Sequence, residues 1–121
     1  MLQPPKVLVV DDDENILSAF KEFLKGERCS VMTTTSISTA MQLLQNRTIS
    51  VLITDIRLKQ DSGITFLLQA KALYPDLPVI VITGYPDYIT EEDVKAYGAR
   101  FFLLKPLDVG KLREALRSCL A

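Results

Sequence analysis

Five polar residues have the chemical types and the spacing that phosphoryl transfer requires. They are the carboxylates Asp11, Asp12 and Asp55, the hydroxyl of Thr83 and the ammonium of Lys105. Carboxylates gathered in one cleft repel one another, so either one takes a proton or a cation binds between them. An all-oxygen site suits Mg²⁺, with Mn²⁺ as a substitute. A carboxylate oxygen of Asp55 would then attack phosphorus, while a hydroxyl donor and a positive charge hold the other oxygens.

Each residue also has a simpler interpretation when it is taken alone. The acidic run 11–14 precedes a predicted helix, whose dipole favours negative charge at that end. Asp55 and Thr83 suit turns, and Lys105 suits a solvated position before a rigid bend at Pro106. Taken together these separate explanations are less convincing. They give no reason why all five residues should stand at the ends of four strands of one sheet.

The elements that must position these residues follow from the hydrophobic pattern. Short apolar runs predict five strands, at 6–10, 30–34, 51–54, 79–82 and 101–104. Amphipathic stretches between them predict helices at 16–24 with Gly26 as the stop, at 37–45, at 63–74, at 90–97 with Gly98 as the stop, and after Asp108. The alternation predicts an α/β domain with a parallel sheet and helices on both faces. The carboxyl ends of its strands would bring the five residues together.

Size and composition limit the number of domains and the classes of function that the chain can have. The 121 residues predict a single domain spanning 1–121, and the net charge of -1 gives no basic excess for binding nucleic acid. No apolar run is long enough to cross a membrane, and no leader segment is visible, so the cytoplasm is the expected compartment. The chain contains no histidine, which excludes catalytic triads that need one and a phosphohistidine on this chain.

Several short motifs together carry a family resemblance. They are Val9-Val10-Asp11-Asp12, Thr54-Asp55, the spacing from Asp55 to Gly63, Ile82-Thr83-Gly84 and Leu104-Lys105-Pro106. From Lys6 to about Leu120 the chain resembles a receiver domain of two-component response regulators, similar to the chemotaxis regulator. The resemblance implies a flavodoxin-like (βα)5 fold with strand order 2-1-3-4-5, and Asp55 as the phosphoacceptor.

The resemblance also implies roles for the neighbouring residues. Asp11 and Asp12 match the acidic pair that binds Mg²⁺, with Asp12 the more direct ligand, and Arg57 would add its backbone carbonyl. Thr83 and Phe102 match the switch pair, although an ordinary core aromatic explains Phe102 equally well. Phenylalanine has no hydroxyl, so it would report only by packing. The Lys105-Pro106 peptide bond would be cis.

Two departures from the family pattern concern the loops. Leu58 and Lys59 stand where the family often has Met-Pro. Arg57 and Tyr85 stand at positions that tune dephosphorylation in the family. A long Arg57 and a bulky Tyr85 would screen an acyl phosphate from water, so we expect slow loss of the phosphoryl group.

The resemblance implies a signalling switch rather than a metabolic enzyme. A histidine kinase or a histidine phosphotransfer protein would donate the phosphoryl group, and the surface made by helix four, strand five and helix five would change. No output domain is expected within 1–121, so the output would be a downstream protein or an attached domain. A homodimer formed through that surface after phosphorylation is a further expectation.

Three alternatives remain open at this point. A receiver-like adaptor would act by binding alone, without phosphorylation. A Mg²⁺-dependent phosphohydrolase usually has a second aspartate two residues after its nucleophile, where this chain has Arg57. A flavin-binding protein of the same fold would need a phosphate-cradling loop after the first strand, where Asp11, Asp12 and Asp13 would repel phosphate.

Overall fold

Strands and helices alternate along the whole chain. The computed structural model describes residues 3–56, 58, 63–84 and 90–121. The elements are β1 (Lys6–Val10), α1 (Glu14–Leu24), β2 (Ser30–Thr34), α2 (Ile37–Asn46), β3 (Val51–Asp55), α3 (Gly63–Leu73), β4 (Val79–Thr83), α4 (Glu91–Ala96), β5 (Phe101–Leu104) and α5 (Val109–Leu120). The strands form one parallel sheet in the order β2-β1-β3-β4-β5, which confirms the predicted topology.

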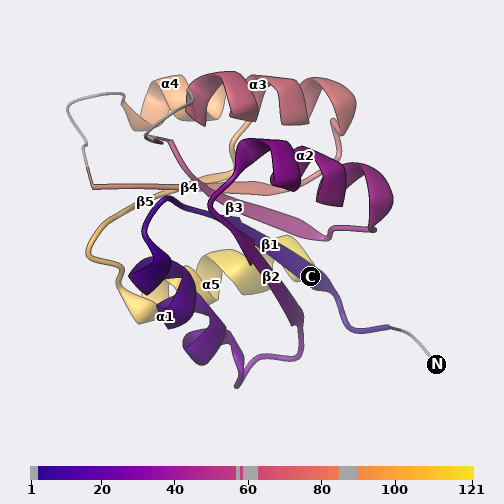
Figure 1. Ribbon diagram of the computed structural model, residues 1–121. Helices are drawn as coiled ribbons and strands as arrows, with labels where there is room; N and C mark the ends of the chain where they lie inside the picture. Colours follow the sequence, from indigo (N-terminus) through magenta and orange to yellow (C-terminus); the bar gives the residue numbers. More distant parts are fainter. Residues whose placement is uncertain (1–2, 57, 59–62, 85–89) are drawn as a thin grey trace.

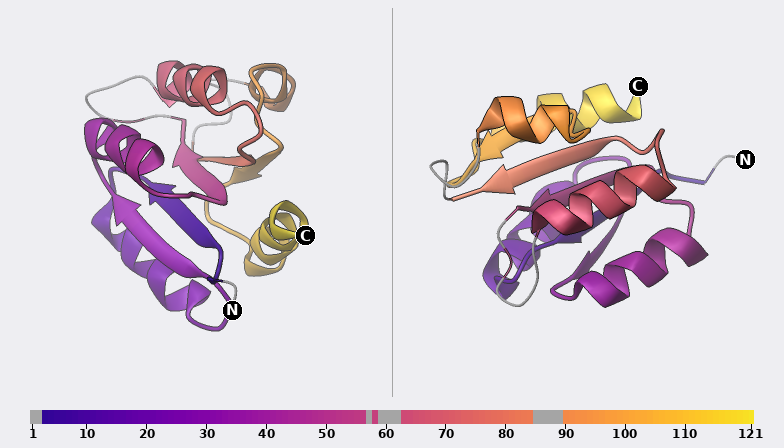
Figure 2. Two further views of the ribbon diagram at one scale, coloured as in Figure 1. Left: turned by 90° about the vertical axis from the view of Figure 1, so that its right-hand side faces the viewer. Right: turned by 90° about the horizontal axis from the view of Figure 1, so that it is seen from above.

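Helices cover both faces of the sheet. Figures 1 and 2 show α2, α3 and α4 on one face, with α1 and α5 on the other. β3 and β4 are buried along their full length, because each lies between two strands and between the two helical layers. This is why their apolar runs are continuous rather than alternating. No helix of the described part of the chain is long and apolar enough to cross a membrane.

The two faces of the sheet form two separate hydrophobic cores. The α2–α4 core consists of buried residues on the α2, α3 and α4 side, namely Leu8, Val10, Ala40, Leu44, Leu52, Ile56, Phe66, Leu67, Ala70, Leu77, Val79, Val81, Val94 and Ala99. The α1–α5 core consists of Val7, Val9, Leu17, Phe20, Leu24, Val51, Ile53, Ile80, Ile82, Leu112, Ala115, Leu116 and Cys119. Successive residues of one strand alternate between these cores, as the pleat of a strand requires.

Strand register brings the polar residues to one edge. Val10 pairs with Thr54, Asp55 pairs with Ile82, and Thr83 pairs with Leu104. β3 and β4 each extend one residue beyond the predicted apolar run, so Asp55 and Thr83 are the last residues of strands. They are therefore held by the sheet rather than by a loop.

Among the described residues, side-chain caps begin α1, α2, α4 and α5. Each cap accepts a hydrogen bond from a backbone N–H of the first turn, as preferred at this position; the caps are Asp13, Ser36, Thr90 and Asp108. The predicted cap at Asp108 and the predicted stop at Gly98, whose φ is 110°, are confirmed.

The predicted end of α1 at Leu24 is confirmed, whereas the predicted ends of α2, α3 and α4 each differ from the structure by one residue. Gly26 does not act as a left-handed stop there, because Lys25, directly after the helix, has right-handed helical geometry and Gly26 has no positive φ. α3 ends at Leu73, one residue before the predicted end. Lys71 contributes to that end, because its Nζ donates to the carbonyl oxygens of Pro75 at 2.7 Å and Leu77 at 2.8 Å.

Candidate functional site

The predicted site residues lie at the carboxyl edge of the sheet. Asp11 directly follows β1, Asp55 and Thr83 end β3 and β4, and Lys105 directly follows β5. The exposed fractions of Asp11, Asp55 and Thr83 are 1%, 6% and 0%. Polar groups this deeply buried need partners or a ligand. The edge therefore carries a built polar site rather than a set of solvated turns.

Lys105 joins the two buried carboxylates. Its Nζ lies 2.7 Å from Asp55 Oδ2, to which it donates a hydrogen bond, and 2.8 Å from Asp11 Oδ2. The lysine side chain is itself only 20% exposed. The sequence argument required a proton or a cation between the carboxylates, and in the structure the ammonium of Lys105 contacts both of them.

Burial and ion pairing shift the pKa values of Asp11 and Lys105 in opposite directions. Burial raises the pKa of Asp11, and its contacts with Lys105 and the Asp13 amide only partly offset this. Burial alone would lower the pKa of Lys105, but Asp11 and Asp55 together raise it above its ordinary value. Lys105 is therefore a cation throughout the neutral range, and the ionised form of Asp11 is held at a cost.

Backbone contacts fix the positions of these side chains. Asp11 Oδ1 accepts a hydrogen bond from the Asp13 amide at 2.9 Å, and the Asp11 amide donates to the Thr34 carbonyl at 3.2 Å. The Lys105 amide donates to the Thr83 carbonyl at 2.8 Å. The Lys105-Pro106 bond is cis, as predicted.

The donor set fits a hard divalent cation. Asp11 Oδ2 is buried and has no hydrogen-bond partner of suitable geometry, although it lies near Lys105 Nζ. A short distance without a hydrogen bond leaves this oxygen with lone pairs that a metal can use, and carboxylate oxygens suit Mg²⁺. Within the described ranges no three acidic, cysteine or histidine side chains gather into a metal cluster. Asp11 and Asp55 are brought together, whereas the role of half-buried Asp12 stays a prediction.

Of the other predicted residues, Phe102 lies within the described part of the chain, and Arg57 and Tyr85 do not. Phe102 on β5 is partly buried and packs against the α2–α4 core. It also lines a hollow of about 330 Å³ together with Glu91, Leu103, Leu104, Pro106, Asp108 and Lys111. The sequence argument did not foresee the close approach of Gly63 to Ile56, although the spacing from Asp55 to Gly63 was a signal.

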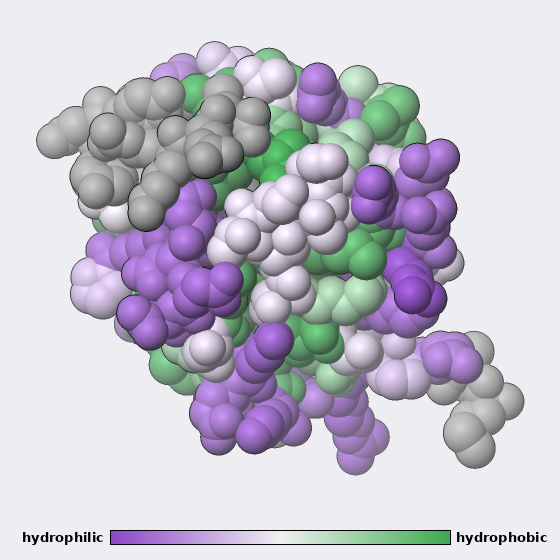
Figure 3. Space-filling model, in the orientation of Figure 1, coloured by the Kyte–Doolittle hydropathy of each residue, from purple (hydrophilic) through white to green (hydrophobic). Residues whose placement is uncertain are grey.

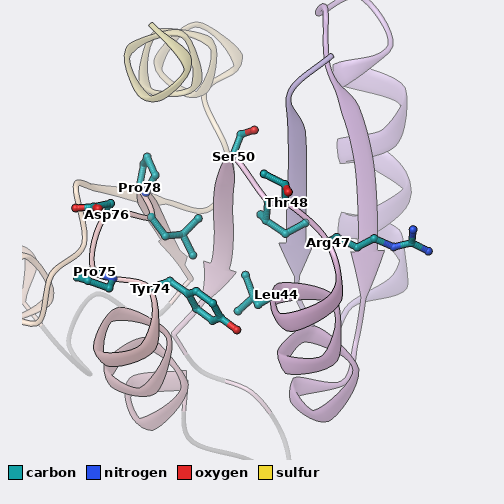
Figure 4. A pocket seen from close by; sticks show the side chains of 10 residues that line it. Leu44, Arg47, Thr48, Ser50, Tyr74, Pro75, Asp76 and Pro78 are labelled. Carbon is teal, nitrogen blue, oxygen red and sulfur yellow. The ribbon is translucent and has the colours of Figure 1, made fainter. Parts of the chain in front are cut away.

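Other hollows of the surface lie away from this chemistry. Figure 4 shows one of about 430 Å³ at the opposite end of the sheet, next to the first residues of β3 and β4. Its lining includes Leu44, Arg47 and Tyr74, but none of the predicted site residues. On the face drawn in Figure 3, hydrophilic residues lie over α1, and hydrophobic ones show mainly between helices.

The fold and the site together define a doubly wound α/β domain with an acidic, lysine-bridged site at the carboxyl edge of its sheet. The family model described as "Response regulator receiver domain" matches residues 7–117. The chain belongs to this family of two-component signalling proteins.

Related sequences and solved structures agree with this assignment. The chain is 32% identical to the transcriptional regulatory protein ZraR of Escherichia coli O157:H7 over 115 residues, which are 95% of this chain and 26% of the relative. It is 34% identical over 110 residues to the alginate biosynthesis transcriptional regulatory protein AlgB of Pseudomonas putida, covering 91% of this chain and 25% of that protein. The chain thus spans about a quarter of the length of these relatives.

Solved receiver domains have the same fold. A response regulator receiver protein from Pseudomonas putida matches with a TM-score of 0.89 and 32% identity, covering 98% of this chain and 99% of that one. The N-terminal signal receiver domain of a response regulator from Bacteroides fragilis has a TM-score of 0.89 and 29% identity, covering 98% of both chains. The predicted flavodoxin-like fold is confirmed.

Asp11→Asn is expected to stabilise the metal-free protein near neutral pH. Because the native pKa of Asp11 is raised, the native state binds the proton more tightly than the unfolded state does. Stability is therefore lost as the pH rises through the native pKa, and an uncharged side chain avoids that loss. The gain should shrink as the pH falls toward the ordinary range of aspartate. Urea unfolding across this pH range measures it.

Mg²⁺ should make the wild-type protein more stable than Asp11→Asn, which reverses the order expected without metal. A ligand at 100 times its Kd stabilises the native state by about 2.7 kcal/mol, and Asp11→Asn removes a proposed ligand. Asp13→Asn is the matched control, because Asp13 is exposed and asparagine caps a helix as well as aspartate does. Equal stabilisation of wild type and Asp11→Asn by Mg²⁺ would contradict a role for Asp11 in metal binding.

Proposed function

We propose that this receiver domain is a phosphorylation-controlled switch that accepts a phosphoryl group on Asp55 in a Mg²⁺-dependent reaction. One observation carries the proposal: the Asp55 carboxylate is buried at a strand end, 2.7 Å from the ammonium of Lys105, which also contacts Asp11. This arrangement holds a nucleophile and a fixed positive charge side by side. It is more than a binding-only adaptor needs.

The residues have distinct tasks in the proposed reaction. A carboxylate oxygen of Asp55 attacks phosphorus, an O–P bond forms, and the N–P bond of the donor's phosphohistidine breaks with its electron pair going to the imidazole. Lys105 neutralises charge on the transferred group, and Thr83 offers a hydroxyl to it. Asp11 and Asp12, with Asp55 and the Arg57 carbonyl, would hold Mg²⁺, which supplies further positive charge beside the phosphoryl oxygens when bound.

The partners follow from this chemistry. The chain has no histidine, so a histidine kinase or a histidine phosphotransfer protein must bring the phosphohistidine. The related proteins ZraR and AlgB are named transcriptional regulators, which supports an attached output domain or a downstream protein as the recipient. Direct nucleic-acid binding by this segment is not proposed, since the net charge is -1. The cytoplasm remains the expected compartment.

The proposed output is a change of surface, not a released product. Thr83 would move toward the phosphoryl group, and Phe102 would repack toward the α2–α4 core that it already contacts. The surface formed by α4, β5 and α5 would then change its partners or form a homodimer. The domain is thus a switch that promotes its own phosphorylation and loses the group slowly, and it is not a metabolic enzyme.

Intact-mass spectrometry with acetyl phosphate as the donor tests the proposal. Wild-type protein with Mg²⁺ should gain the mass of one phosphoryl group, and the same mixture with EDTA should gain none. If no adduct forms, the phosphoryl mimic beryllofluoride is added with Mg²⁺ and followed by NMR. Spectral changes at Thr83 and Lys105 would show an acceptor that rejects small donors, whereas an unchanged spectrum would favour the binding-only adaptor.

A further inference from the structure

Gly63, the first residue of α3, closes directly against the backbone of Ile56. A Cβ atom on Gly63 would lie 2.7 Å from Ile56 Cα and closer still to the carbonyl carbon and oxygen of Ile56. Carbon atoms in contact need about 3.5–4.0 Å, so something must shift. Among the described glycines only Gly98 has a positive φ. The backbone conformation of Gly63 is therefore open to other residues, and glycine is required there because a side chain has no space.

Ile56 is held from its other sides as well. Its amide donates to the Ile82 carbonyl at 3.2 Å, which continues the pairing of β3 with β4 beyond Asp55. Its side chain is 1% exposed and belongs to the α2–α4 core. A peptide fixed by a strand, a core and a helix start has little freedom to retreat. A displacement of Ile56 from the α3 side would therefore also move its chain neighbour on the strand side.

That neighbour is Asp55, whose Oδ2 lies 2.7 Å from Lys105 Nζ. We infer that Gly63 is a positioning residue: its missing side chain lets α3 back the Ile56 peptide and so sets the Asp55 carboxylate against Lys105. The kinetic part of this inference rests on the proposed phosphorylation of Asp55, whereas the geometric part does not. A misplacement of about 1 Å at a reacting group can cost roughly 100-fold in rate.

The test compares Gly63→Ala with two controls. Gly26→Ala adds the same methyl group in an exposed turn, where nothing lies within 4 Å. Leu44→Ala removes side-chain volume from the same α2–α4 core beside the hollow of Figure 4, and so controls for a general loss of core stability. If Gly63→Ala is unfolded in buffer, all proteins are compared in trimethylamine N-oxide, which favours the folded state.

Two readouts are taken on each folded protein. The first is the NMR signals of the Asp55 carboxyl carbon and the Lys105 Nζ nitrogen, without metal or donor. The second is the rate of adduct formation from acetyl phosphate at saturating Mg²⁺. We expect Gly63→Ala to shift both NMR signals and to slow phosphorylation by about 10-fold to 100-fold. Both controls should keep wild-type signals and rates.

The possible results separate the two claims. Unchanged Asp55 and Lys105 signals in folded Gly63→Ala overturn the inference, and so does a shift of equal size in Leu44→Ala. Gly63→Ala that stays unfolded in the osmolyte also overturns it, because the clash is then not absorbed locally at Ile56. Absence of any adduct in the wild type would instead defeat the proposed function, while the NMR comparison would still decide the geometric part.

Discussion

Asp55→Asn should abolish the phosphoryl adduct, with a loss of at least about 100-fold in the rate of adduct formation. The amide of asparagine is close in size to the carboxylate but lacks the negative oxygen that attacks phosphorus. Its oxygen can still accept from Lys105 Nζ, so the lysine keeps a partner. Intact-mass spectrometry after incubation with acetyl phosphate and Mg²⁺ measures the loss.

A second aspartate provides the matched control for this substitution. Asp76 is exposed at the opposite end of the sheet, beside the hollow of Figure 4. Asp76→Asn makes the same chemical change and should leave the adduct intact. An adduct of full yield in Asp55→Asn would place the acceptor on another residue and would contradict the central proposal.

Lys105→Met should weaken both folding and phosphorylation. Without the ammonium, Asp11 and Asp55 keep their buried positions but lose the cation within 2.8 Å of both. Removing one partner of a buried ion pair costs about 3 kcal/mol of the free energy of unfolding. Phosphorylation should slow by about 100-fold, because charge on the transferred group is no longer neutralised.

The stability part of this prediction has a definite pH dependence. In the variant, Asp11 keeps its burial and its repulsion by Asp55 but loses the Lys105 contact that lowers its pKa, so its native pKa lies further above the unfolded value. Stability is then lost as the pH rises through that native pKa, so the deficit of Lys105→Met should grow as the pH rises from the ordinary range of aspartate into the neutral range. Urea unfolding followed by circular dichroism measures this difference.

An exposed lysine pair supplies the reference. Lys95 Nζ lies 3.0 Å from Glu91 Oε2 on the surface of α4, where both side chains are about half exposed. Lys95→Met should change the free energy of unfolding by no more than about 0.5 kcal/mol. A Lys105→Met deficit of this small size, constant with pH, would show that the buried bridge contributes no more than a surface pair.

The sheet and its order could be predicted from the sequence because the physical signals are strong. The runs at β1, β3 and β4 are continuously apolar, which only strands buried on both faces require. The polar residues at the ends of the predicted strands pointed to the carboxyl edge, and Asp11, Asp55, Thr83 and Lys105 do lie there. The fold and the location of the site followed from these runs.

The details that could not be predicted depend on tertiary contacts. Apolar pattern ended β3 at Thr54, yet pairing with Ile82 draws Asp55 into the strand. Gly26 was a reasonable stop by type, but Lys25 continues in helical geometry before it. The ammonium of Lys105 between two carboxylates is a side-chain placement across fifty residues, and no local pattern encodes it.

The position of β1, β3 and β4 inside the sheet makes their amide protons probes of global unfolding. Each of these strands has a hydrogen-bonded neighbour on both sides and a helical layer on both faces. Their amide protons can reach solvent deuterium only when the whole domain opens, so their exchange rates report the global opening equilibrium. A chain without tryptophan thus carries probes for comparing all of these variants under native conditions, one amide at a time.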